Sequence, residues 1–244
     1  MKPCFRQFSA PLAALALFAA AGPAYAQECV GLPGGRGILS LGVEGTDGAT
    51  GRGVAFAYQT EGASVQLQHR SLDAFAQQDE ISETEVQGAM RLGRFGLPLC
   101  LTAGVQLADY EYSEHAGSGT GQDGIYTDSY RIIGGYERVR VPVGISLGRE
   151  FSVGRGVSLV PYLQPTVVWE SERMTSVGNV ARTGTGGSVT ETRNGLGWGV
   201  NTGVAVARDW LVVRANLSHT NTVDRALSTR YNRPGVSLHL GVRF

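Results

Sequence analysis

The stretch PGVSLHLGVRF, residues 234–244, alternates apolar and polar side chains up to the last residue. One parity carries Ser237, His239, Gly241 and Arg243, and the other carries Val236, Leu238, Leu240, Val242 and Phe244. Because successive side chains of a β-strand point to opposite faces, this strand has one apolar and one polar face. Such a strand, ending in an aromatic residue, is typical of lipid outside and a polar lumen inside. The stretch therefore predicts an all-β fold, an antiparallel up-and-down transmembrane β-barrel.

The beginning of the chain has the features of an export signal. Lys2 and Arg6 form a positive segment, residues 10–20 are apolar, and Ala24-Tyr25-Ala26 is a small-x-small cleavage site. We expect cleavage between Ala26 and Gln27, which makes 1–26 the signal peptide and 27–244 the barrel domain. No apolar run after this site approaches the ~20 residues of a membrane helix, so we expect any membrane crossing to use strands.

About ten segments repeat the alternation. They lie at roughly 37–44, 52–59, 63–70, 84–92, 99–112, 131–149, 156–170, 194–207, 209–220 and 235–244. Eight or twelve strands are alternatives, because they too give an even number. A soluble antiparallel sandwich is a further alternative, because its strands show the same two-residue alternation of apolar and polar side chains. The connections favour the barrel, because long ones alternate with short ones such as 60–62 and the Arg208-Asp209 turn. An even number of strands places both termini at the same end, which we expect to be periplasmic.

Two further patterns test this interpretation of the strands. Pro161 and Pro165 cannot donate to a strand ladder, so we expect a bulge or local unpairing in the seventh segment. Trp210 beside a short turn, and Trp169, Tyr110 and Tyr112 near the opposite strand ends, are typical of two interfacial girdles of aromatic residues.

The chain resembles the small outer-membrane barrels of the OmpA/OmpX-like family. The export signal, the alternating strands with long outer loops and the ending VSLHLGVRF carry this resemblance. It implies the outer membrane of a Gram-negative-type bacterium, with outer-membrane lipids and lipopolysaccharide around the barrel. It also implies periplasmic chaperones and the barrel-assembly machinery as partners, with Val236, Leu238, Leu240, Val242 and Phe244 as the assembly signal. It names no ligand for the outer loops.

A barrel of this size has an interior that side chains mostly fill. The inward parity predicts a polar lumen network of Glu85, Arg91, Arg138, Arg140, Glu170, Arg214, His239 and Arg243. Single buried charges are unfavourable, so we expect these groups to pair and to close the lumen. This favours a structural or surface-interaction barrel. The alternative is a narrow channel for small solutes, because Gly197, Gly199, Gly203 and Ala205 leave room in the eighth segment.

The two cysteines of the mature chain, Cys29 and Cys100, are both expected at the periplasmic end. In an oxidising compartment two such thiols can form a disulfide, provided that their Cα atoms lie within ~7 Å. We expect this disulfide to tether the N-terminal segment to a periplasmic turn.

The sequence offers little for catalysis, metals or nucleic acid. The four histidines, His69, His115, His219 and His239, lack ligand spacing, and the formal net charge is +0, so we expect no metal, no cofactor and no nucleic acid partner. The segment 119–124 matches GxGxxG but is interpreted as a flexible loop, with weak calcium binding by Asp123 and Asp128 as the alternative.

His219 is expected to face lipid. The run Ser218-His219-Thr220-Asn221 distantly resembles lipid A deacylases, but Asn221 stands where a dyad needs a hydroxyl, so we predict no enzyme.

Overall fold

The computed structural model describes residues 29–33, 37–46, 49–60, 62–74, 80–92, 99–120, 127–180, 186–222 and 234–244. The predicted cleavage site and Asp123 lie outside these residues. The strands are β1 (Gly37–Thr46), β2 (Ala49–Gln59), β3 (Ala63–Ala74), β4 (Glu80–Arg91), β5 (Leu99–Thr120), β6 (Thr127–Gly148), β7 (Phe151–Gly154), β8 (Val157–Val180), β9 (Gly186–Arg208), β10 (Leu211–Thr222) and β11 (Gly235–Arg243). A 3₁₀ turn, η2 (Cys29–Gly31), precedes them.

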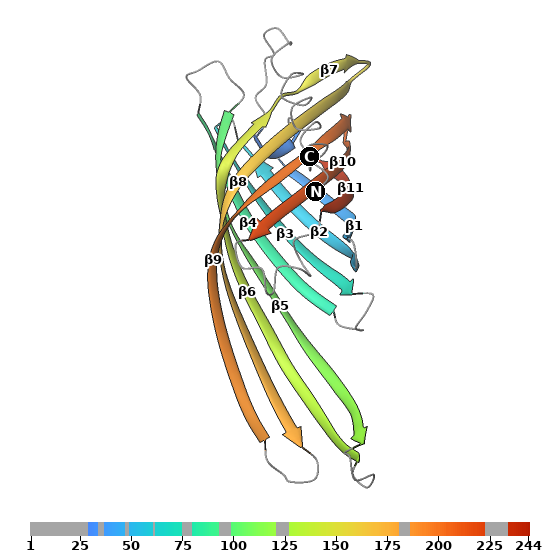
Figure 1. Cartoon of the computed structure of the whole chain (residues 1–244). Coiled ribbons are helices and arrows are strands. Elements are labelled where there is room, and N and C mark those ends of the chain that lie inside the picture. The colour runs from blue at the N-terminus through green and yellow to red at the C-terminus, as the bar shows by residue number, and fades with distance from the viewer. Residues whose placement is uncertain are drawn as a thin grey trace, which may run out of the picture.

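The strands form a closed antiparallel barrel (Figure 1). Each long strand pairs with its neighbours along the chain, β1 pairs with β11, and β6 pairs with β8 across the short β7. Ten strands therefore run around the barrel, as predicted, and β7 adds only a hairpin to β8. Closure removes the free sheet edges that an open sheet would expose.

The two ends of the barrel differ. At the proximal end, as we call it, Gly37 and Phe244 exchange two backbone hydrogen bonds of 3.0 Å, which join the first and last strands. At the opposite, distal end, β5, β6, β8 and β9 extend beyond their neighbours (Figure 1). Pairing of β4 with β5 ends at Asp109, and pairing of β9 with β10 ends at Gly197. We call the extension, residues 110–120, 127–136, 174–180 and 186–191, the distal wall.

The outer surface of the barrel carries an apolar belt. Within this belt, side chains that pair in register on neighbouring strands form rows. One such row runs across five successive strands through Leu39, Phe56, Leu67, Val86 and Val105. All of these side chains are exposed, as are Leu41 at 69% and Leu240 at 58%. Exposed large apolar side chains in continuous rows are unfavourable in water, and they fit a lipid environment.

Several predicted boundaries were wrong in the same direction. Residues 113–120, 127–130, 171–180 and 186–193, which the sequence places in long outer connections, continue as strand. The connection between β1 and β2 is also shorter than predicted, because β1 reaches Thr46 and β2 begins at Ala49. The physical reason is that backbone pairing of these strands continues past the apolar belt, where the sequence loses the regular apolar alternation that marks a strand.

Pairing of β6 with β8 is interrupted at one place, around Pro165, and no bulge forms there. The β6–β8 ladder lacks pairs between Gly144–Thr166 and Leu147–Leu163, around Pro165, and the register does not shift there. Pairing of β8 with β9 continues without interruption through Pro161 and Pro165. Local unpairing, one of the two predicted outcomes, is confirmed, because a proline lacks the N–H group that the neighbouring strand would bind.

Candidate functional site

The centre of the lumen holds a chain of ion pairs. Arg70 of β3 donates to Glu44 of β1 at 2.9 Å and to Glu83 of β4, and Arg138 of β6 donates to Glu83 at 3.3 Å. All four side chains lie on the inward parity of their strands, and Glu83 is only 3% exposed. A buried carboxylate between two guanidinium groups is stable only with such partners, so the four residues form one unit.

A second pair continues this network along β6 and β8. Arg140 donates to Glu170, and both residues are buried. Where the distal wall begins, the Tyr136 hydroxyl donates to the Glu172 carboxylate. The inward charges on these strands are therefore neutralised locally, as the sequence predicted for Arg138, Arg140 and Glu170.

Arg214 crosses the lumen on the proximal side of these pairs. Its Nη1 donates to Gln66 Oε1 at 3.2 Å, and its Nη2 donates to the Tyr162 hydroxyl at 3.1 Å. Gln66 lies on β3 and Tyr162 on β8, so a β10 side chain joins strands from different sides of the barrel. The Tyr162 hydroxyl donates in turn to Asn216 Oδ1 at 2.5 Å. We call Gln66, Arg214, Tyr162 and Asn216 the transverse layer.

The other predicted lumen residues have different positions. His239 is buried, with Nε2 3.7 Å from Glu44 Oε1, and Glu85 lies within electrostatic range of Arg70. Arg91 is half-buried near the proximal end, where it pairs in register with Cys100. Arg243 lies at the rim and donates to the Asp209 carbonyl at 2.6 and 3.1 Å.

Sequence reasoning missed three members of the central unit. Glu83 was missed because the predicted segment began at 84, although Glu83 and Glu85 share one parity. Arg70 and Glu44 stand at the ends of predicted segments, on the polar parity, and that signal alone identifies them as inward charges.

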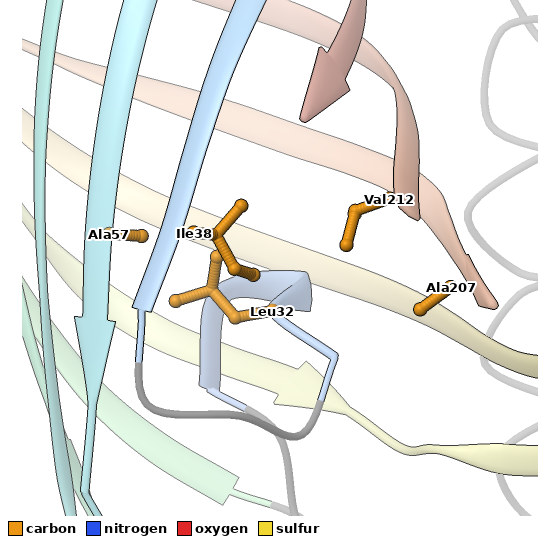
Figure 2. Close-up of a cluster of buried hydrophobic side chains, with 5 residues drawn as sticks. All are labelled: Leu32, Ile38, Ala57, Ala207 and Val212. Carbon is orange, nitrogen blue, oxygen red and sulfur yellow. The ribbon is translucent and has the colours of Figure 1, made fainter. Parts of the chain in front are cut away.

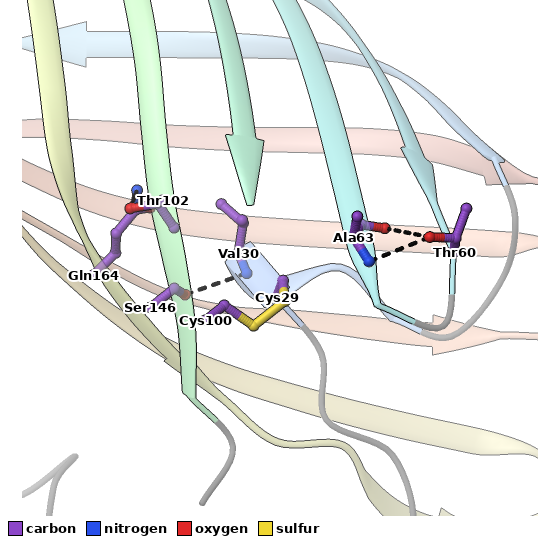
Figure 3. The surroundings of a disulfide bond; sticks show 8 residues. All are labelled: Cys29, Val30, Thr60, Ala63, Cys100, Thr102, Ser146 and Gln164. Carbon is purple, nitrogen blue, oxygen red and sulfur yellow. Dashed lines mark hydrogen bonds between the residues drawn. A yellow bond between two sulfur atoms is a disulfide. The ribbon is translucent and has the colours of Figure 1, made fainter. Parts of the chain in front are cut away.

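The N-terminal segment 29–33 closes the proximal mouth from inside the barrel. All five of its residues are buried, although none belongs to a strand. Cys29 and Cys100 are joined as a disulfide in the structure, with Cα atoms 5.8 Å apart, and the Val30 N–H donates to Ser146 Oγ at 3.2 Å (Figure 3). Leu32 packs in an apolar cluster with Ile38, Ala57, Ala207 and Val212 (Figure 2). We call residues 29–33 the plug segment.

The plug segment fits closely against the transverse layer. A Cβ atom at Gly31 would overlap the ring of Tyr162, so only glycine fits there. Between the plug segment and the layer a cavity of about 20 Å³ remains, lined by Leu32, Pro33, Arg214 and His239 among others. A cavity of this volume holds about one water molecule.

The outward-facing His219 packs on an aromatic neighbour rather than on a hydroxyl group. Its ring centroid lies 5.4 Å from that of Trp198, which is 43% exposed. A Cβ at Gly199, an inward position on β9, would lie 3.4 Å from Thr220 Oγ1, so Thr220 is directed inward, away from His219. Trp169 also faces outward, and Trp210 lies in the proximal turn, whereas the side chains of Tyr110 and Tyr112 lie outside the described residues.

The described part of the chain contains neither a candidate metal site nor a candidate membrane-spanning helix. No group of three or more His, Cys, Asp or Glu in this part of the chain is arranged to hold a metal ion. Within the same residues, no helix has the length and apolar character to cross a membrane.

Comparison with known proteins gives structural similarity only. No protein-family model and no curated protein matches the chain. Among solved structures, it is similar to the translocator domain of the autotransporter NalP from Neisseria meningitidis, with 12% identity, a TM-score of 0.48 and coverage of 98% of this chain and 95% of that one. It is similar to LpxR from Salmonella typhimurium at 9% identity, TM-score 0.38, and coverage of 85% and 100%. It is also similar to Ail of Yersinia pestis at 12% identity, TM-score 0.31, and coverage of 87% and 100%.

Proposed function

We propose that this chain is an integral outer-membrane β-barrel protein with a closed lumen, whose distal wall contacts molecules outside the cell. The observation that carries this proposal is the extension of β5, β6, β8 and β9 beyond the end of the apolar belt. The belt supplies a lipid-facing surface, whereas the wall extends the sheet beyond the exposed ion pair of Arg173 and Glu137. The surrounding outer-membrane lipids and lipopolysaccharide are the expected neighbours of the belt.

The position on β8 where the apolar surface ends supports this distinction between a lipid-facing belt and an exposed distal wall. On β8 the outward residues Val167 and Trp169 belong to the belt, and Arg173 follows them on the same face. Arg173 lies 3.8 Å from Glu137 of β6, and both side chains are more than half exposed. An exposed ion pair is unfavourable in lipid, so the membrane boundary lies between Trp169 and Arg173. Trp169 and Trp198 then lie at the interface, where aromatic residues are enriched.

The proposal places the proximal end in the periplasm. The proximal connections described are short: the β2–β3 turn lies between Gln59 and Ala63, and the β9–β10 turn between Arg208 and Leu211. Outer-membrane barrels have short turns on the periplasmic side and long elements on the outside. Insertion by the barrel-assembly machinery, with periplasmic chaperones, fits the apolar alternation of β11.

Labelling of introduced cysteines on intact cells tests location and orientation together. Thr190→Cys places a thiol on the exposed distal wall, Arg155→Cys places one in the proximal β7–β8 turn, and Leu238→Cys places one in the belt. With a membrane-impermeant maleimide we expect labelling of T190C on intact cells, of R155C only after permeabilisation, and of L238C in neither case. Labelling of R155C but not T190C on intact cells would reverse the orientation, and labelling of L238C would contradict the membrane belt.

The proposal includes no catalytic activity. A lipid-modifying enzyme is the competing function, since His219 faces outward near the membrane boundary. Mass spectrometry of lipid A from cells with and without the protein separates the two. We expect an identical acyl pattern, and a missing acyl chain in the producing cells would favour the enzyme.

A further inference from the structure

We propose that residues 29–33 close a conducting path through the barrel and that the Cys29–Cys100 disulfide holds them in place. This inference goes beyond the closed barrel proposed above and does not depend on what the distal wall binds. It concerns the one described segment that is buried inside the lumen without belonging to a strand.

The barrel wall around the plug segment is lined by small side chains. On β2 the inward residues are Ala55 and Ala57, and on β9 they are Gly203, Ala205 and Ala207. These residues do not reach far into a lumen, and the side chains of a barrel this wide must fill it if it is to be closed. Leu32 packs into the remaining space, as the cluster in Figure 2 illustrates, and the next residue, Pro33, is fully buried. Without the plug segment the proximal lumen would be open.

The conformation of the plug segment needs external support. Val30 has φ 60°, in the left-handed region that β-branched residues rarely adopt. Such a residue persists when its surroundings hold it there. Here the preceding residue forms the disulfide and the Val30 N–H donates to Ser146 Oγ (Figure 3). The following Gly31 fits against the ring of Tyr162. Of these contacts the disulfide alone is covalent. Breaking it therefore allows the plug segment to move out of the lumen.

Among the described residues, those that cross the lumen beyond the plug segment do so with their side chains alone. Arg214 reaches Gln66 through a single hydrogen bond of 3.2 Å, and its other partners are Tyr162 and Asn216. Tyr162 packs against Gly31, so departure of the plug segment removes one face of its packing. Arginine and glutamine side chains exchange rotamers far faster than a disulfide-bonded backbone segment can move. The transverse layer therefore narrows the path, whereas the plug segment closes it.

Charge along the path favours small ions of either sign. The central unit pairs Arg70 and Arg138 with Glu44 and Glu83, so two positive groups face two negative ones. Paired charges do not form a ring of one sign, which is what gives a pore its strong selectivity. We expect potassium and chloride both to pass.

Planar-bilayer recording in potassium chloride tests the proposal on the full mature chain. The oxidised wild type should stay closed. Cys29→Ser/Cys100→Ser removes the tether, and Leu32→Asp places a carboxylate in the apolar cluster while leaving the disulfide intact. Because tethering raises the effective concentration of a docked segment by large factors, we expect the open fraction of the double cysteine variant to rise about 100-fold. We expect L32D to open as well, because an unpaired carboxylate is unfavourable in the apolar cluster around Leu32.

A matched control comes from the same end of the barrel. Thr60 lies in the β2–β3 turn, where its Oγ1 donates to the Ala63 carbonyl at 3.0 Å, and it makes no described contact with the plug segment (Figure 3). Thr60→Ala should remain closed like the wild type. Intact mass without reductant verifies the disulfide, and a mobility difference between boiled and unboiled samples verifies folding of each variant.

Every outcome decides the proposal. Steady conductance in the oxidised wild type would overturn it, as would closed behaviour of both folded variants or equal opening of T60A. If the double cysteine variant does not fold, L32D decides alone: opening supports the plug, and a closed L32D barrel overturns it.

Discussion

At the scale of the residue, Glu83 is the most consequential side chain of the lumen. It accepts hydrogen bonds from both Arg70 and Arg138 and is 3% exposed. Breaking a buried pair leaves an uncompensated charge, which is far more destabilising than loss of a surface pair.

Glu83→Gln should therefore destabilise the barrel by about 3–5 kcal/mol, the cost of stranding a buried charge. The measurement is the free energy of unfolding in urea, with the protein in lipid vesicles. Glu191→Gln is the control, because Glu191 pairs with Arg193 at an exposed position and should contribute under about 1 kcal/mol. Equal stability of E83Q and wild type would show that the central unit does not hold the lumen together.

The residue scale also shows what sequence can predict. Parity alone correctly directs Arg138, Arg140, Glu170, Arg214 and His239 into the lumen, because the face of a side chain depends only on its position in the strand. The hydrogen-bond partner of an inward side chain cannot be predicted in this way. Arg214 donates to Gln66, 148 positions away in the chain, and the alternation within a strand carries no information about such a contact. Arg243 has the right parity, yet it lies too near the strand end to reach the network.

At the scale of the element, β11 closes the barrel on both edges. Leu240 pairs in register with Leu41 of β1 and Val213 of β10, and all three side chains belong to the belt. Leu240→Arg should cost about 2–4 kcal/mol, as a charge at the middle of a lipid-facing strand does.

The same urea measurement in vesicles checks this value. Thr190→Arg on the distal wall is the control and should leave stability unchanged, because its side chain is exposed beyond the belt. A tolerated L240R, with T190R equally stable, would contradict lipid contact at β11.

The distal wall is the element that the sequence described least well. Residues 113–130 contain Gly117, Gly119 and Gly121 and lose the apolar alternation, so they are predicted as a loop. In the structure Ser113–Thr120 and Thr127–Ile133 pair with each other, with one register shift between Ala116 and Gly119. Pairing persists because backbone hydrogen bonds do not require an apolar face.

A shortened wall should still leave a folded barrel. Replacing residues 114–132 by an Asn-Gly turn joins Ser113 to Ile133, which are already partners in register. We expect the variant to retain the mobility difference between boiled and unboiled samples, since the belt and the central unit are untouched. Loss of that difference would mean that the wall supports the barrel rather than serving contact outside it.

At the scale of the whole molecule, strand number and closure follow from the sequence, whereas the plug segment does not. Ten alternating segments, an even number, predict ten strands with both termini at one end, and the structure confirms the strands and their closure. Residues 29–33 have no periodicity, and their contacts with Ser146 and Tyr162 join distant parts of the chain. Only Cys29 and Cys100 suggest from sequence that the N-terminal segment is held at the barrel.

The central claim is that this chain folds as a closed barrel with a lipid-facing belt. The most direct measurement is electrophoretic mobility of the mature protein, refolded into lipid vesicles, with and without boiling. A closed barrel whose strand edges are paired along the belt resists detergent until it is heated, so the unboiled protein should migrate at a different position from the boiled one. Identical mobility of the two samples after refolding would contradict the account.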